Sequence, residues 1–381
     1  MSERTACGVV PVISYSAFAG RIRDRLSQER IPLEGSIELT FRCNLRCAHC
    51  YVNEPSGDRR ARRQELTTAE VLRITDEVVD LGCLWILLTG GEVLLRPDFT
   101  EMYLHMKKKG LMVAVFTNGT MITPWIADLL AEWPPLVVEI TIYGSTQAVH
   151  ERVTDIPDSF RRCIRGIELL LDRKIRLRLK TVPTTLNYSD MGGMRALAAG
   201  YGLDFHWDPL INCRVDTSKR PAEVRLRPEQ IVELEKQDPR RVADLQREFL
   251  RWDPLEPSPE LFTCGAYRHS FHVDPYGNLF PCMLVRWPAF SLREGPFRQG
   301  WYEFFPVMRN RLRTKALPCD TCRFNASCDY CVGWAQIETG DLEGDVPFLC
   351  DLTHARSEAF GPQGQPLLQI EQKERLVAHG S

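Results

Sequence analysis

Residues 41–51 read FRCNLRCAHCY and bring three cysteines, Cys43, Cys47 and Cys50, into one short window. A tetrahedral zinc site takes four ligands, usually from two separated pairs, and structural disulfides take an even number of cysteines. Three thiols with C-x3-C-x2-C spacing fit neither arrangement. The stretch therefore indicates a metal centre in which one coordination position is left for a group that is not protein.

The composition is that of an ordinary globular protein. Of 381 residues, 44% are hydrophobic and 26% are charged, and the net charge of −2 gives no electrostatic basis for binding nucleic acid or a membrane surface. The sequence contains no signal peptide and no apolar run near the ~20 residues that a membrane span needs. We therefore expect a cytoplasmic protein whose thiols stay reduced, and metal ligation is the leading explanation for its 14 cysteines.

From residue 36 onward, strand-like and helix-like segments alternate. Strands are predicted over 36–42, 84–89, 112–117, 136–144, 175–182 and 203–210, and helices over 66–82, 98–110, 124–133, 159–174 and 189–199. Such βαβ units wind into a full or partial (β/α) barrel through right-handed crossovers. We predict an α/β fold with a partial (β/α)6 barrel. The loops after its strands share one mouth, where residues 41–51 are expected.

The domain limits follow from changes in this pattern. An N-terminal segment (1–35), with a short helix over 16–30, precedes the barrel (36–215), and the arginine-rich stretch 59–63 is expected to be a solvated loop. A charged, proline-containing stretch (216–260) is interpreted as a helical linker. Residues 261–351 contain short runs, prolines, glycines and seven cysteines, which is typical of a small domain organised by metal ligation. A tail (352–381) ends the chain.

The C-x3-C-x2-C motif, followed by the aromatic Tyr51, resembles the motif of radical S-adenosylmethionine (SAM) enzymes. In that family, three thiolates hold a [4Fe–4S] cluster whose fourth iron chelates SAM. The resemblance implies that Cys43, Cys47 and Cys50 are catalytic ligands and that SAM is cleaved to a 5′-deoxyadenosyl radical, which abstracts hydrogen from a substrate. It also implies that Tyr51 packs near the adenine and that a flavodoxin- or ferredoxin-type protein delivers electrons.

A second family motif follows the second predicted strand. Gly90, Gly91 and Glu92 resemble the GGE motif that receives the SAM ammonium group. Glycines allow close backbone approach, and a carboxylate pairs with a cation.

Three more positions match residues near the cofactor in the family. Asn118 lies in FTNGT (116–120) at the end of the third strand, although Asn-Gly is also a common turn pair. Thr141 matches a polar residue of the fourth strand that contacts SAM. Arg152 matches an arginine that pairs with the SAM carboxylate, although it could instead be a surface helix arginine. The resemblance covers roughly residues 36–215.

The seven downstream cysteines resemble the SPASM domain, which carries auxiliary iron–sulfur clusters. The spacing C-x12-G-x4-C, C-x2-C-x5-C-x2-C and a final cysteine differs from the usual pattern only in its last x2, where x3 is usual. The resemblance implies a distal cluster and a proximal one, held respectively by Cys319, Cys322, Cys328 and Cys350 and by Cys264, Cys282 and Cys331. Ser270 occupies the position of a further proximal ligand, so this cluster has either an open iron or a ligand from elsewhere, such as Cys213.

SPASM-type enzymes most often modify peptides, so the leading hypothesis is a maturase that crosslinks or otherwise oxidises a ribosomally made precursor peptide, with a separate leader-binding protein as a potential partner. Alternatives are a dehydrogenase or epimerase acting on a sugar or another small molecule, and a sulfatase maturase that forms formylglycine. Met283 stands against the last, because relatives of that type have an aspartate there. A zinc-stapled binding module is the non-enzymatic alternative, although the gap between the CxxC pairs is short for zinc ribbons.

Overall fold

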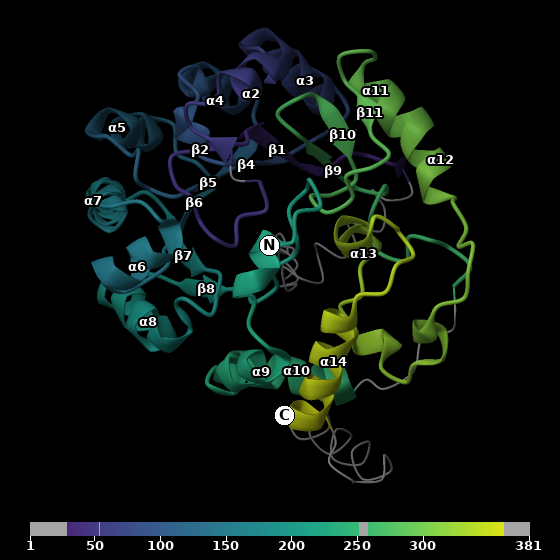
Figure 1. Ribbon diagram of the computed structural model, residues 1–381. Coiled ribbons are helices and arrows are strands. Elements are labelled where there is room, and N and C mark those ends of the chain that lie inside the picture. Colours follow the sequence, from purple (N-terminus) through teal and green to yellow (C-terminus); the bar gives the residue numbers. More distant parts are fainter. Residues whose placement is uncertain (1–28, 53, 251–257, 362–381) are drawn as a thin grey trace, which may run out of the picture.

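The computed structural model describes residues 29–52, 54–250 and 258–361. Six parallel strands form the predicted partial barrel, in the order β1-β4-β5-β6-β7-β8 (Figure 1). These strands are β1 (Glu34–Thr40), β4 (Trp85–Gly90), β5 (Met112–Thr117), β6 (Val137–Thr141), β7 (Leu177–Thr181) and β8 (Phe205–Trp207). The predicted α/β fold class and all six strands are confirmed.

The predicted helices connect these strands and lie on the outer side of the sheet (Figure 1). They are α3 (Thr68–Asp80), α4 (Phe99–Lys108), α5 (Pro124–Glu132), α7 (Ser159–Asp172) and α8 (Met191–Gly200). Helix α3 begins at a capping box in which Thr67 and Glu70 satisfy each other's backbone amides. Helix α5 begins with Pro124 after the capping side chain of Thr123.

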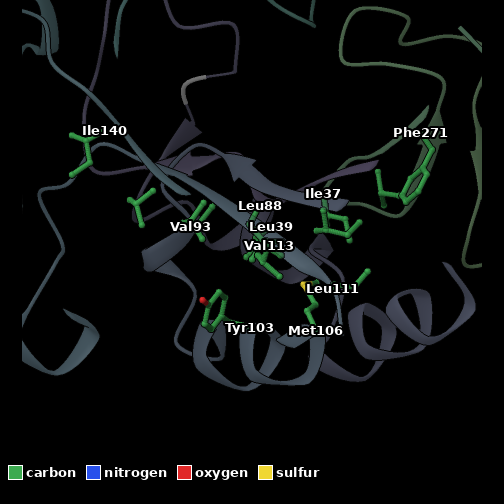
Figure 2. Close-up of a cluster of buried hydrophobic side chains, with 14 of the residues drawn as sticks. Ile37, Leu39, Leu88, Val93, Tyr103, Met106, Leu111, Val113, Ile140 and Phe271 are labelled. Atoms are coloured by element: carbon green, nitrogen blue, oxygen red, sulfur yellow. The ribbon is translucent and has the colours of Figure 1, made fainter. Parts of the chain in front are cut away.

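The core lies between the sheet and these helices. Figure 2 shows Ile37 and Leu39 of β1 beside Leu88 of β4, packed toward Tyr103 and Met106 of α4. Successive strand residues point to opposite faces, so the residues that alternate with this buried set face the inner side of the partial barrel. The inner face is therefore the place for polar, functional side chains.

The sheet continues past β1 into the cysteine-rich region. Strand β9 (Ser270–Val273) pairs in parallel with β1, and β10 (Asn278–Phe280) and β11 (Phe290–Ser291) extend the sheet in antiparallel fashion. Short helical segments follow: α11 (Phe297–Gln299), a π-turn (Gly300–Phe304), α12 (Phe305–Arg309), α13 (Val332–Thr339) and α14 (Pro347–Phe360). The first strand of the barrel thus connects it directly to the cysteine-rich region.

Two helices precede this region, α9 (Pro228–Lys236) and α10 (Pro239–Leu250), and both pack against α14. Arg356 of α14 forms a buried ion pair with Glu235 of α9, with 2.7 Å between Nη2 and Oε1. Helices α9 and α10, which lie between the barrel and the cysteine-rich region, are therefore held against α14.

Some local expectations differ from the structure. The arginine-rich stretch is solvent-exposed as expected, but it forms a helix, α2 (Arg59–Gln64), because Asp58 caps its first turn. Helix α6 (Gln147–Thr154) was not predicted separately. The short helix predicted over 16–30 lies almost entirely outside the described residues. Among the described helices, none has the length and apolar character needed to cross a membrane.

Candidate functional site

The three cysteines of residues 41–51 gather at the carboxyl end of β1. Cys43, Cys47 and Cys50 share a cluster with Tyr143 and Val153. Burial raises the pKa of Cys43 to about 12 and raises that of Cys47 well above its usual range, and each of these two thiols also interacts electrostatically with Cys50. Thiolates at this position therefore need a compensating positive charge, which bound iron supplies.

Helix α6 and the end of β6 hold the cysteine loop. The backbone amide of Arg46 donates to the carbonyl of Thr154 (2.9 Å), and that of Ala48 donates to Val153 (3.3 Å). The ring of Tyr143 packs edge-on against His49, with centroids 4.9 Å apart. These contacts hold the loop on both sides of the second cysteine, Cys47.

Asn118 of the FTNGT segment also contacts the cysteine loop. Its Nδ2 donates to Asn44 Oδ1 (2.9 Å) and lies 3.7 Å from Cys43 Sγ. The Asn44 amide in turn donates to Thr120 Oγ1 (2.8 Å). The predicted site residue Asn118 thus positions the cysteine loop, and no motif in the sequence indicates that Asn44 pairs with it.

Gly90 and Gly91 lie where strand β4 passes the start of the cysteine loop. A Cβ atom on Gly90, whose φ is +125°, would lie 2.3 Å from the carbonyl oxygen of Thr40, and one on Gly91 would lie 2.2 Å from that of Arg42. The Gly91 amide donates to Thr40 (2.7 Å). Close approach was predicted from these glycines, and the structure shows that the backbone they approach is that of residues 40–42.

Glu92 is fully buried behind the two glycines. Its carboxylate accepts hydrogen bonds from Thr117 Oγ1 (2.8 and 2.9 Å), from the Asn118 amide (2.8 Å) and from the Leu94 amide (3.1 Å). Burial raises the pKa of Glu92, and these donors oppose that rise. Glu92 therefore connects the GGE segment to FTNGT, directly beneath the cysteine loop.

The remaining predicted residues surround the same edge of the sheet. Thr141 ends β6, half-buried. Arg152 is exposed on α6 and donates to the carbonyl of Leu186 (2.5 Å), a residue packed against the cysteine cluster. The hydroxyl of Tyr51 donates to Glu38 Oε1 (2.7 Å).

Glu38 belongs to a buried polar network that the sequence analysis missed. On the inner face of β1, its carboxylate lies 2.8 Å from His272 Nε2 of β9 and 2.9 Å from Arg286 Nη1. Burial alone would raise the pKa of Glu38, but Arg286 and His272 lower it to about 2. The available signal was a glutamate that alternates with the apolar Ile37 and Leu39 of the same strand and therefore points inward.

The downstream cysteines form two sets. Burial raises the pKa of Cys331 to about 11, and Cys282 and Cys264 contribute to that rise because they lie close by. In the second set, Cys319 interacts in the same way with the other three, namely Cys328, Cys322 and Cys350. These groupings agree with the predicted proximal and distal sets.

Cys213 is buried. The charges that act on its thiol are those of Glu338, Arg225 and Lys219. Within residues 29–52, 54–250 and 258–361, no three His, Cys, Asp or Glu side chains gather closely enough to hold one metal ion. An iron–sulfur cluster distributes its thiolates over several irons, so its ligands are more widely spaced than those of a single zinc ion.

A cavity of about 320 Å³ joins the inner face of the barrel to the proximal set. Ser36, Leu87 and Ala114 of the inner face line one side, and Cys282 and Met283 line another. The cavity lies at the amino ends of β1, β4 and β5, so the inner face extends from the cysteine loop at the carboxyl ends of the strands to Cys282 at the other end.

Known proteins are similar to this chain in sequence and in fold. The sequence profile of the Radical SAM superfamily matches residues 37–196. The mycofactocin maturase MftC of Mycobacterium ulcerans is 30% identical over 81% of this chain and 85% of its own length. The chain belongs to the radical SAM superfamily. It is an enzyme of that superfamily, and the cysteine loop lies within the matched region.

Two further proteins place this radical SAM enzyme among its relatives. The AdoMet-dependent heme synthase of Methanosarcina barkeri is 28% identical over 82% of this chain and 94% of its own length. The crystal structure of Streptococcus suis SuiB bound to its precursor peptide SuiA has a TM-score of 0.66 and 17% identity, covering 92% of this chain and 84% of that one. This last likeness is one of fold.

The residues present suit the [4Fe–4S] cluster and SAM that the superfamily implies. The Nδ1 atom of His49, between the second and third cysteines, is buried and has no hydrogen-bond partner among the described residues. An unsatisfied buried polar atom is costly, and a group bound at the cysteine loop would give it a partner. The three gathered thiols and this orphaned nitrogen together fit a bound cofactor.

Proposed function

We propose that this radical SAM enzyme oxidatively modifies a peptide substrate, with residues 261–351 as a SPASM-type domain. The inner face carries the proposal, because it runs from the cysteine loop at the carboxyl ends of the strands to the cavity beside Cys282 at their amino ends, so one bound substrate can extend between the two. The maturase relative and the SuiB fold, seen with a precursor peptide, support a peptide as the substrate. A cluster at Cys43, Cys47 and Cys50 supplies one-electron cleavage of SAM and, through it, abstraction of a hydrogen atom from the substrate.

The residues around the cysteine loop bind and orient the cofactor in this proposal. Thr141 and Arg152 offer a hydroxyl and a guanidinium at the rim, suited to the polar groups and the carboxylate of SAM. The GGE backbone, fixed by Glu92, receives the SAM ammonium group. Tyr51, whose hydroxyl is anchored by Glu38, offers its ring to the adenine. Asn118 holds the loop and, as predicted from the family motif, lies beside the cofactor.

The downstream cysteines hold two auxiliary clusters in this proposal. Cys319, Cys322, Cys328 and Cys350 provide four thiolates for the distal one, and Cys264, Cys282 and Cys331 provide three for the proximal one. The fourth position of the proximal cluster is either an open iron or a ligand from elsewhere, such as Cys213. A two-electron oxidation removes one hydrogen atom from the substrate and then one electron and one proton. An iron–sulfur cluster held by the proximal thiols would accept the outgoing electron, and a flavodoxin- or ferredoxin-type protein would supply the reducing electron for SAM.

The heme synthase relative favours a second candidate, oxidation of a porphyrin-type small molecule. The same inner face and cavity would hold it.

One experiment separates the two candidates. Anaerobically reconstituted enzyme, with dithionite and SAM, is incubated with short peptides encoded beside the gene or with porphyrin precursors of heme. We expect 5′-deoxyadenosine together with a peptide lighter by two hydrogen atoms, whereas turnover of the porphyrin alone would refute the peptide proposal.

A further inference from the structure

Two basic side chains share one carboxylate on strands β6 and β7. Arg178 Nη1 lies 2.9 Å from Glu139 Oε1, and Lys180 Nζ lies 3.2 Å from Glu139 Oε2. The Lys180 ammonium also lies 2.9 Å from the centre of the Phe116 ring on β5. These four residues, called the cationic wall below, carry one more positive charge than negative charge.

The cationic wall is on the inner face of the partial barrel. The residues that alternate with it on β6 and β7 are buried in the core against the helices, namely Val138, Ile140, Leu177 and Leu179. Successive strand residues point to opposite faces, so Glu139, Arg178 and Lys180 point inward. Phe116, Glu139 and Arg178 are neighbours in register across β5, β6 and β7.

The wall lies close to the cysteine loop. Lys180 is in register with Thr141, the last residue of β6. Phe116 lies two residues before Asn118, whose Nδ2 is 3.7 Å from Cys43 Sγ. A strand advances about 3.3 Å per residue, so the wall begins within one or two residue steps of the edge where the thiols gather. Phe116 also follows the cavity-lining Ala114 on the same face.

The excess charge of the wall is partly removed from water. The side chains of Arg178, Lys180 and Glu139 are 33%, 24% and 13% exposed. Burial lowers the pKa of Lys180 to about 8; Glu139 opposes this shift and Arg178 adds to it. The only other ionisable neighbour in register among the described strand residues is the exposed His206 on β8. One cation would suffice to pair Glu139 across the strands, so the second is available to a ligand.

We propose that the cationic wall binds a carboxylate of the substrate, with Lys180 and Arg178 as donors and Phe116 as the apolar neighbour. Guanidinium and ammonium groups that are partly desolvated bind carboxylates strongly. The inference rests on the proposed function, because it requires the substrate to occupy the inner face. It adds that the substrate presents an acidic side chain, a chain terminus or another carboxylate beside the reacting carbon.

The test observes Lys180 directly and needs no turnover. Reductive methylation with carbon-13 formaldehyde gives each lysine of the anaerobic holoenzyme an NMR signal, and Lys180→Arg identifies that of Lys180. N-acetylphenylalanine and its neutral amide serve as matched probes. We expect the acid, but not the amide, to shift the Lys180 signal and raise its titration midpoint, while the signal of the exposed Lys174 stays constant. Equal responses to acid and amide, or none to either, would overturn the proposal.

SAM also carries a carboxylate, so a second arm separates the two sources. SAM alone should leave the Lys180 signal in place, and the acid should still shift it afterwards. In Arg178→Met, the acid should bind about tenfold more weakly, which corresponds to ~1.4 kcal/mol. A shift caused by SAM alone, which then blocks the acid, would contradict a substrate site. If the acid has no effect while the enzyme still modifies a peptide, the proposed function stands and this inference falls.

Discussion

Glu38 and Arg286 are separated by most of the chain, yet Glu38 Oε2 lies 2.9 Å from Arg286 Nη1. Glu38 is on the first strand of the barrel, and Arg286 follows the proximal cysteine Cys282. His272 and Tyr51 complete the network around the buried carboxylate. This network ties the SAM-binding half of the molecule to the cysteine-rich half.

Removing the charge of Glu38 should destabilise the fold. In Glu38→Gln, the Arg286 guanidinium remains buried without its counter-charge, and loss of one partner of a buried pair costs roughly 3–5 kcal/mol. Urea unfolding measures this loss. Glu233→Gln is the matched control, because the Lys236–Glu233 pair is exposed and its loss should cost at most about 1 kcal/mol. Equal stability of Glu38→Gln and wild type would contradict the role given to the network.

The same carboxylate should make stability depend on acid pH. The pKa of Glu38 is about 2 in the folded protein against an ordinary value of 4.5, so its ionised form stabilises the fold above pH 4.5. This contribution, roughly 3 kcal/mol, should disappear as pH falls toward 2, because the unfolded state then binds the extra proton. We expect the difference in unfolding free energy between wild type and Glu38→Gln to narrow over that range. If this difference in unfolding free energy stays constant down to about pH 2, Glu38 is not the source of the pH-dependent stability.

A methyl group on Gly91 should disturb the cysteine loop. In Gly91→Ala, the new Cβ would lie 2.2 Å from the carbonyl oxygen of Arg42, so the backbone must shift, at a cost of roughly 3 kcal/mol. We expect lower iron content at the first site and weaker SAM cleavage. Gly57→Ala is the control, since its Cβ would meet no atom within 4 Å. Normal iron content and cleavage in Gly91→Ala would show that the close approach is not required.

Single cysteine variants should distinguish the two downstream sets. If three [4Fe–4S] clusters are bound, the wild-type enzyme holds about 12 irons per chain. Cys328→Ala and Cys282→Ala should each lose about four of them, from different clusters, and the double variant should lose about eight. Cys163→Ala, a buried thiol of the core, is the control and should lose none. Two results would contradict the assignment of two auxiliary clusters. One is zinc in place of iron, and the other is a double variant that loses no more iron than either single variant.

Much of the fold could be predicted from sequence because its signals are local. Strand β5 was predicted to the residue, since a short run of apolar residues, MVAVFT, is ended there by the turn pair Asn118-Gly119. The site residues were predicted from motif spacing, and the structure brings Cys43, Cys47 and Cys50 together near Glu92 and Asn118.

Interactions between distant segments were not predictable in the same way. Nothing local in the sequence indicates that β9 pairs with β1 or that Arg286 reaches Glu38, because such contacts depend on how the chain returns to the first strand. The role of Asn118 illustrates the same limit. Its proximity to the site was predicted, but its partner Asn44 became evident only from the packed loop.

The central claim is that Cys43, Cys47 and Cys50 form the site of SAM cleavage. The most direct measurement is 5′-deoxyadenosine formation by reconstituted enzyme with dithionite and SAM, compared with the triple variant Cys43→Ala, Cys47→Ala, Cys50→Ala. We predict that the wild-type enzyme forms it and that the triple variant forms none, while iron bound by the downstream cysteines is retained. Continued 5′-deoxyadenosine formation by the triple variant would contradict the claim.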